Sequence, residues 1–220
     1  MDKKLKIGTI DVDEVVQDKL SLMFDPVDKG DPEKFIIEET TDGYNVRYIT
    51  VDNEPESPRQ CDNFGTMVCF HKEYNLGDGE HAYRSEDFNS WDELRDKIES
   101  NENPGVVLPL YLYDHSGITM KTSPFNDRWD SGQVGFIFVS KDKIREEFAI
   151  EDKDAEITDE IFENAKKILE SEVLLYDYYL TGDVYRLVKE KFDNDGQQVD
   201  FDIVGGYYGI ESTKEELKTF

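Results

Sequence analysis

The stretch that decides the fold is "VVLPLYLYDHSGITMKTSPFNDRWDSGQVGFIFVSK", residues 106–141. It contains two apolar runs, 106–113 and 133–140, each about as long as a β-strand. The second run is apolar at successive positions, which is typical of a strand that is covered on both faces. Pro109 cannot donate to a ladder, so the first run is predicted to lie at an edge or to carry a bulge.

Polar residues stand where these two runs end and begin. Asp114, His115 and Ser116 follow the first run, and Asp130 precedes the second. Antiparallel pairing would bring them to one end of the sheet. Adjacent residues of a strand point to opposite faces, which argues against a catalytic triad of neighbours. The favoured interpretation is a turn before Gly117 in which the polar side chains bond backbone groups. The alternative is that His115 acts as a general base oriented by Asp130.

Hydrophobic periodicity over the rest of the chain predicts an α+β fold. Apolar positions keep a helical period from about 158 to 181, which indicates one long amphipathic helix. Ser90 and Glu93 form a capping box at the start of a shorter helix. We expect a mostly antiparallel sheet with short capping helices, and we expect residues 1–220 to form a single acidic domain with 106–141 as its neutral core segment.

Two hairpins are predicted from turn residues between alternating runs. The first turn lies at 41–43 and the second at 193–196. In the strand after the second turn, alternate apolar residues are expected to face the core while aspartates between them face solvent. These inward residues are Val199, Phe201 and Ile203.

Charge limits the class of partner. The chain has 51 acidic and 25 basic residues, a net charge of −26, which argues against binding to nucleic acid or to anionic membrane. Aromatic residues make up 12% of the chain, unlike in disordered acidic proteins, so we expect it to fold. No apolar run approaches the roughly 20 residues of a membrane span. The lack of a secretory h-region and of a disulfide framework favours a reducing bacterial cytosol.

No cofactor and no metal site are predicted. The sequence lacks a Walker loop and a dinucleotide-binding Gly-x-Gly-x-x-Gly. Potential metal ligands are few, and the spacing between the two cysteines is longer than in structural zinc knuckles. They are Cys61, Cys69, His71, His81 and His115.

Several runs resemble proteins of phage and mobile-element genomes, a family without an established activity. The resemblance covers roughly 53–210 and implies a small protein that serves a phage or plasmid inside a bacterium. Related sequences carry Ser-Cys-Pro before Trp-Asp-Ser-Gly, whereas this chain has Asn-Asp-Arg, so the resemblance supports no thiol nucleophile there. The runs are DNFGTMVCFHKEYNLGD (62–78), YRSEDFNSW (83–91), LPLYLYDHSGITMKTSPF (108–125), WDSGQVGFIFVSK (129–141) and YDYYLTGDVY (176–185).

Charge and this setting together suggest an anti-defence inhibitor of the anti-CRISPR or anti-restriction type. Its carboxylates would imitate DNA phosphates in the basic groove of a host defence protein or another nucleic-acid-binding protein. The competing interpretation is that the acids only solvate the surface. The candidate interaction residues are Asp11, Asp13, Glu14, Asp18, Glu151, Asp152, Asp154, Glu156, Asp159 and Glu160.

Two other functions stay open. One is a small hydrolase-like enzyme with a strand-end pocket around Asp114, His115 and Asp130, although the sequence lacks the Gly-x-Ser-x-Gly of a nucleophile elbow. The other is a non-enzymatic phage module that binds another protein through the aromatic-rich segment 173–187. Trp129, next to Asp130, is expected to cap the core.

Overall fold

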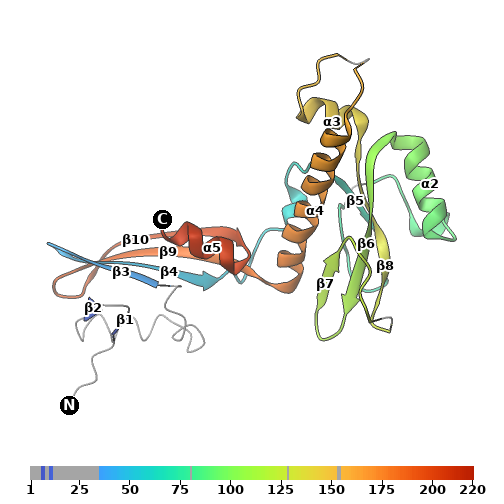
Figure 1. Ribbon diagram of the computed structural model, residues 1–220. Helices are drawn as coiled ribbons and strands as arrows, with labels where there is room; N and C mark the ends of the chain where they lie inside the picture. Colours follow the sequence, from blue (N-terminus) through green and yellow to red (C-terminus); the bar gives the residue numbers. More distant parts are fainter. Residues whose placement is uncertain (1–5, 8–9, 12–34, 80, 128, 153–154) are drawn as a thin grey trace. The chain divides into compact units, whose positions relative to one another are not determined.

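The computed structural model describes residues 6–7, 10–11, 35–79, 81–127, 129–152 and 155–220 (Figure 1). Contacts divide the chain into two compact units, where the sequence predicted a single domain. We call Ser57–Thr181 the central unit, and Met1–Glu56 with Gly182–Phe220 the terminal unit. Each contains an antiparallel four-stranded sheet and at least one helix, so the predicted α+β class is confirmed.

The sheet of the central unit has the strand order β5-β8-β6-β7. The predicted pairing of the two apolar runs is confirmed, because β6 and β8 are antiparallel neighbours, with Val107 opposite Phe138. The register shifts between Leu110 and Tyr111, which marks a bulge in the paired strands. The bounds are β5 Thr66–Cys69, β6 Pro104–Asp114, β7 Ile118–Lys121 and β8 Ser131–Ser140.

Pro109 occupies a position where β6 has a strand on one side only. It lies opposite Phe136 of β8, whereas β7 pairs with β6 only from Tyr111 to Asp114. The missing N–H of the proline therefore costs no ladder bond to β7, even though β6 as a whole is an inner strand.

Helices cover both faces of this sheet (Figure 1). Phe136 and Phe138 of β8 pack with Leu94 of α2, and Ile137 packs with Leu169 of α4 on the opposite face. Successive residues of a strand point to opposite sides, so two covered faces require the continuous apolar run that the sequence shows. The helices are α2 Trp91–Glu102, α3 Lys141–Glu147 and α4 Asp159–Thr181, with short 3-10 turns η3 Pro58–Gln60 and η4 Ser85–Asp87.

Side chains cap the helices much as the sequence indicates. The Oγ of Ser90 accepts the N–H of Glu93 at 3.2 Å at the start of α2. The Glu93 carboxylate returns to the N–H of Asn89 at 2.8 Å, one residue before the usual partner in a capping box. In α4, the Oγ1 of Thr158 accepts the N–H of Ile161 at 3.4 Å. The long helix therefore begins within one residue of its predicted start.

The terminal unit has a sheet of order β10-β9-β4-β3. Both predicted hairpins are present, since β3 pairs with β4 and β9 pairs with β10. Leu217 of α5 packs on Ile49 and Leu187 on one face of the sheet. The bounds are β3 Phe35–Thr40, β4 Gly43–Val51, β9 Val184–Asp193, β10 Gln198–Tyr208 and α5 Ile210–Leu217, with the short strands β1 Lys6–Ile7 and β2 Ile10–Asp11.

The predicted burial of β10 is wrong. Val199, Phe201 and Ile203 are 56%, 52% and 42% exposed. β10 is the edge strand of its sheet and pairs only with β9 among the described residues. Alternation indicates which residues of a strand share a face, but it does not indicate whether anything covers that face.

Candidate functional sites

One end of the central sheet brings together the residues that the sequence singled out. β6 ends at Asp114 and β8 begins at Ser131, and the register pairs Tyr113 with Ser131. The backbone N–H of Asp114 donates to the carbonyl of Asp130 at 2.8 Å. Asp114, His115 and Asp130 therefore meet at this strand end, as antiparallel pairing requires.

His115 and Asp130 form a direct contact. The His115 Nδ1 and the Asp130 Oδ2 are 2.9 Å apart, and the two side chains are 63% and 39% exposed. A carboxylate in this position orients an imidazole. Because both side chains face solvent, the pair lacks the low-dielectric surroundings in which charged catalytic groups act most strongly.

Among the described residues, neither serine next to this pair forms a hydrogen bond with His115. The Ser131 hydroxyl donates to the carbonyl of Asp127. Ser116 lies in a turn with φ of +61°, followed by Gly117 with φ of +147°, and the N–H of His115 donates to the Gly117 carbonyl at 3.1 Å. The geometry supports the predicted turn before Gly117. The hydrogen bond within the turn joins two backbone groups, whereas the sequence predicted hydrogen bonds from polar side chains.

Asp114 contacts different residues from its neighbour His115. Its Oδ1 accepts the phenol of Tyr74 at 3.2 Å. Partial burial, the charge of Asp114 and this hydrogen bond raise the pKa of Tyr74. Tyr74 also stacks on His71, with 4.9 Å between ring centroids. Tyr74 was not predicted from the sequence, because it lies 40 residues from Asp114 and only the fold joins them.

Trp129 is an exposed residue of the same strand end. Its side chain is 95% exposed, so the prediction that it caps the core is wrong. Its backbone N–H donates to the Asp127 carboxylate at 2.8 Å, within a turn that directs the chain toward β8. This end of the sheet therefore carries an exposed aromatic side chain as well as the exposed His115–Asp130 pair.

A second candidate site is the acidic surface, formed by exposed carboxylates between α3 and the first turn of α4. Four of these carboxylates form no ion pair with another described residue. They are Glu151, Glu156, Asp159 and Glu160. Asp159 and Glu160 also lie in the first turn of α4, where negative charge stabilises a helix. We define the acidic surface as the exposed residues Glu151, Glu156, Asp159 and Glu160; Asp152, which is also exposed, follows Glu151 in the chain.

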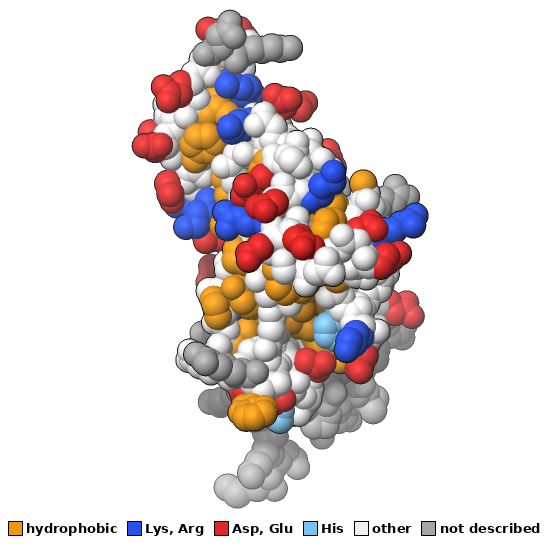
Figure 2. Space-filling model, turned by 90° about the vertical axis from the view of Figure 1, so that its right-hand side faces the viewer, with side chains coloured by type: hydrophobic (Ala, Val, Ile, Leu, Met, Phe, Trp, Pro, Cys, Tyr) orange, Lys and Arg blue, Asp and Glu red, His pale blue; other side chains and the backbone are white. Residues whose placement is uncertain are grey.

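Two described cations of α3 bond to backbone carbonyls. The Lys143 ammonium donates to the carbonyl of Asn63, and the Arg145 guanidinium donates to that of Ala155 at 2.8 Å. Beside the acidic surface lies a hollow of about 550 Å³. In the upper part of Figure 2, acidic side chains lie around hydrophobic and basic ones. The hollow is lined by Asp142, Arg145, Glu146, Ala149, Ile150 and Glu151.

The other predicted interaction residues are not placed with these. Asp11 belongs to β2, and its side chain is outside the description. Asp13, Glu14, Asp18 and Asp154 lie outside the described residues. The continuity of an acidic surface over all ten predicted residues therefore stays a prediction.

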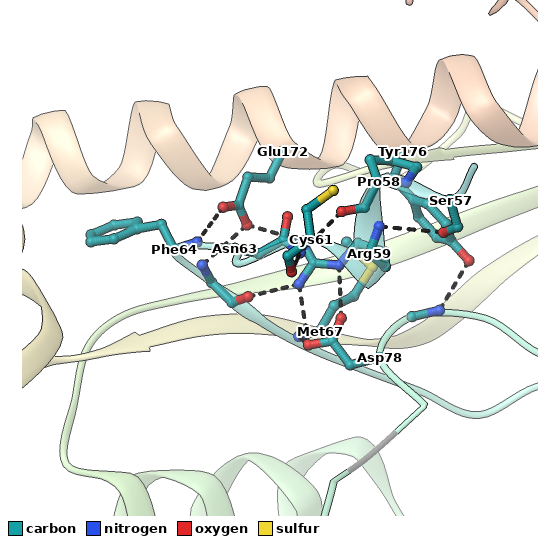
Figure 3. A network of polar contacts seen from close by, with 12 residues as sticks. Ser57, Pro58, Arg59, Cys61, Asn63, Phe64, Met67, Asp78, Glu172 and Tyr176 are labelled. Carbon is teal, nitrogen blue, oxygen red and sulfur yellow. Dashed lines mark hydrogen bonds and ion pairs between the residues drawn. The ribbon is translucent and has the colours of Figure 1, made fainter. Parts of the chain in front are cut away.

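A buried ion network, which the sequence did not indicate, connects three segments of the central unit (Figure 3). The Arg59 side chain is 3% exposed, and its Nε lies 2.7 Å from Asp78 and its Nη1 3.0 Å from Glu172. Its Nη2 also donates to the carbonyl of Gly65 at 2.7 Å. Burial lowers the pKa of Arg59, but the two carboxylates outweigh it and raise the pKa above the usual value. The network holds the loop around η3 to α4.

No protein-family model, curated protein or solved structure matched the chain. The resemblance to phage and mobile-element proteins therefore stays a prediction, and the function is inferred from the residues of this chain.

The cysteines and histidines are not collected into a centre. Among the described residues, no group of three or more His, Cys, Asp or Glu side chains is arranged to hold a metal ion. Cys61 is exposed and Cys69 is buried.

Among the residues that the structure describes, no helix is long and apolar enough to cross a bilayer. The aromatic-rich segment 173–187 contributes Val173 and Tyr176 to the core of the central unit, which removes them from any docking surface.

Proposed function

We propose that this protein is a phage or mobile-element inhibitor whose acidic surface binds a basic, nucleic-acid-binding host protein. The observation that carries the proposal is the set of exposed carboxylates that form no ion pair with another described residue, namely Glu151, Glu156, Asp159 and Glu160. Such carboxylates are available to Arg and Lys of a partner, with which they form charge-assisted hydrogen bonds. The net charge of −26 adds long-range attraction.

Competition with DNA is the central expectation of this proposal. Duplex DNA carries one negative charge per about 1.7 Å of its axis, so a groove built for it attracts a surface with closely spaced carboxylates. The immobilised protein should capture nucleic-acid-binding proteins from a bacterial lysate, and added duplex DNA should release them. Capture should weaken steeply between 0.1 and 1 M salt, where the screening length falls from about 10 Å to about 3 Å.

The test variant removes charge without changing the first turn of α4. Replacing Glu146, Glu151 and Glu156 with Gln leaves Asp159 and Glu160 to stabilise the helix. The variant should lose captured protein at least tenfold while its melting temperature stays unchanged or rises, since self-repulsion is reduced.

A matched control removes the same charge elsewhere on the central unit. Glu86, Asp87 and Asp96 are exposed residues of η4 and α2, and their replacement by Gln or Asn leaves the acidic surface intact. This control should capture as the original protein does. Equal losses in both variants, or a captured set without nucleic-acid-binding proteins, would contradict the proposal.

The second candidate function is a small hydrolase-like enzyme, and the 2.9 Å contact between His115 and Asp130 favours it. Under this alternative, His115→Ala would abolish a hydrolytic activity without changing the melting temperature. Asp127→Asn, a substitution nearby that spares the pair, would keep the activity. If His115→Ala leaves every biological effect of the protein intact, the contact serves only to hold the turn.

A further inference from the structure

β10 is a long strand at the edge of the sheet of the terminal unit, and it has exposed apolar side chains. β10 runs from Gln198 to Tyr208 and pairs with β9 on one side, and no described strand lies on its other side. Val199, Phe201 and Ile203 stand at alternate positions and are 42–56% exposed. Proteins usually shorten, cover or charge such an edge, because it readily pairs with another chain.

The backbone of an edge strand selects the kind of ligand. From Asp200 to Val204, where its pairing with β9 has no register shift, its N–H and C=O groups repeat at the spacing of a ladder, which an extended polypeptide matches. The N–H of Phe201 donates to the carboxylate of Asp200 at 3.0 Å. The carbonyl of an added strand would replace that carboxylate, which is free to move because the residue is exposed.

The two aspartates of β10 favour basic residues in an added strand. Asp200 and Asp202 lie opposite Lys191 and Lys189 of β9. A residue on an added strand would lie about 5 Å from each aspartate, but about 10 Å from the lysines of β9, beyond the screening length of about 8 Å. Lys or Arg at those positions is therefore attracted by the near aspartates more than it is repelled by the lysines.

A second copy of this chain is a poor occupant. In an antiparallel pair of β10 strands, one register joins all three apolar side chains, with Phe201 opposite Phe201 and Val199 opposite Ile203. That register places Asp200 opposite Asp202 twice, and like charges directly opposite destabilise a sheet. The aspartates thus oppose self-pairing and favour a basic strand.

We propose that β10 receives a strand of a partner protein in which apolar residues alternate with Lys or Arg. The apolar residues lie beside Val199, Phe201 and Ile203, and the basic residues beside Asp200 and Asp202. This site is independent of the proposed function, because the acidic surface belongs to the central unit.

The probe is an acetylated and amidated synthetic peptide, Lys-Val-Lys-Ile-Lys-Val-Lys, added to the full chain. Hydrogen exchange of individual amides is the measurement, since pairing protects them. The peptide should slow exchange in β10 by about tenfold or more. A peptide with Glu in place of Lys should give no protection, and neither should a basic peptide with a central proline, which keeps the charge but interrupts the ladder.

Charge reversal separates strand pairing from general attraction to an acidic protein. Asp200→Lys with Asp202→Lys should reverse the preference, so that the acidic peptide protects β10 and the basic one does not. The matched control, Asp42→Lys with Asp195→Lys, changes the net charge equally at exposed turn positions and should keep the original preference.

Three results would overturn the proposal. The first is equal protection by the proline-containing peptide, which would mean electrostatic association without a ladder. The second is equal loss of protection in the reversal variant and its control. The third is a dimer in sedimentation with β10 protected in the absence of peptide, which would make a second copy the occupant.

Discussion

Replacing Arg59 with methionine should destabilise the central unit by about 3 kcal/mol. Methionine keeps much of the apolar volume but removes the buried guanidinium, leaving the Asp78 and Glu172 carboxylates without their cation. Breaking a buried ion pair on one side costs about 3–5 kcal/mol, because the remaining charge stays desolvated. The carbonyl of Gly65 loses its donor as well.

The lower end of that range applies because both carboxylates keep other donors. Asp78 still accepts the N–H of Met67 at 2.8 Å. Glu172 still accepts the N–H groups of Phe64 and Gly65 at 2.6 and 3.1 Å. These bonds stabilise the ionised carboxylates and limit the loss.

Tryptophan fluorescence follows this unit alone, since Trp91 and Trp129, the two tryptophans of the chain, both lie in it. For a unit of this size we expect the melting temperature to fall by about 12 °C, at roughly 4 °C per kcal/mol. The control is Arg95→Met, whose ion pair with Glu99 is exposed and is worth about 0.5 kcal/mol.

A double substitution tests whether the residues act together. Glu172→Gln added to Arg59→Met removes one of the two unpaired charges, so the double variant should lose less stability than the sum of the two single variants. A loss below about 1 kcal/mol for Arg59→Met, or a loss equal to that of Arg95→Met, would refute this account of the network.

Three further predictions concern both units. A thiol reagent should modify exposed Cys61 in the native protein and Cys69 only after unfolding, because burial and the charge of Asp78 raise the pKa of Cys69 to about 12. Burial opposes ionisation of Asp52, but hydrogen bonds from Arg186 and backbone groups outweigh this effect and lower the pKa of Asp52. The terminal unit should therefore lose stability as pH falls below about 4. Asp52→Asn should flatten this pH dependence of stability, measured by amide exchange at a series of pH values. Amides of β8, paired on both sides, should exchange more slowly than those of β10.

Local patterns were sufficient to predict the long helix, the two hairpins and the central strand pair. The run 133–140 is apolar on both faces because α2 and α4 cover the two sides of β8, and that pairing places His115 near Asp130. The α+β class follows from such patterns.

Contacts between residues far apart in the sequence, and the exposure of an edge strand, could not be predicted in this way. Arg59 and Glu172 are 113 residues apart, and an isolated arginine in a loop has no pattern that indicates a buried network. Val199 and Phe201 alternate like core residues although their strand lies at an edge. Periodicity reports the two faces of a strand, whereas burial depends on which elements lie beside it.

The central unit is a single continuous segment between the two parts of the terminal unit. Roughly 130 residues separate β4 from its neighbour β9. On a ribosome that adds about 5–20 residues per second, the β3–β4 hairpin waits on the order of ten seconds for β9, while the whole central unit emerges. The N–H of Asp52 donates to the carbonyl of Val184 at 2.8 Å, so the two points where the chain leaves and re-enters the sheet are adjacent. We therefore expect that the central segment can be replaced by a short loop, so that each unit can be produced as a separate protein.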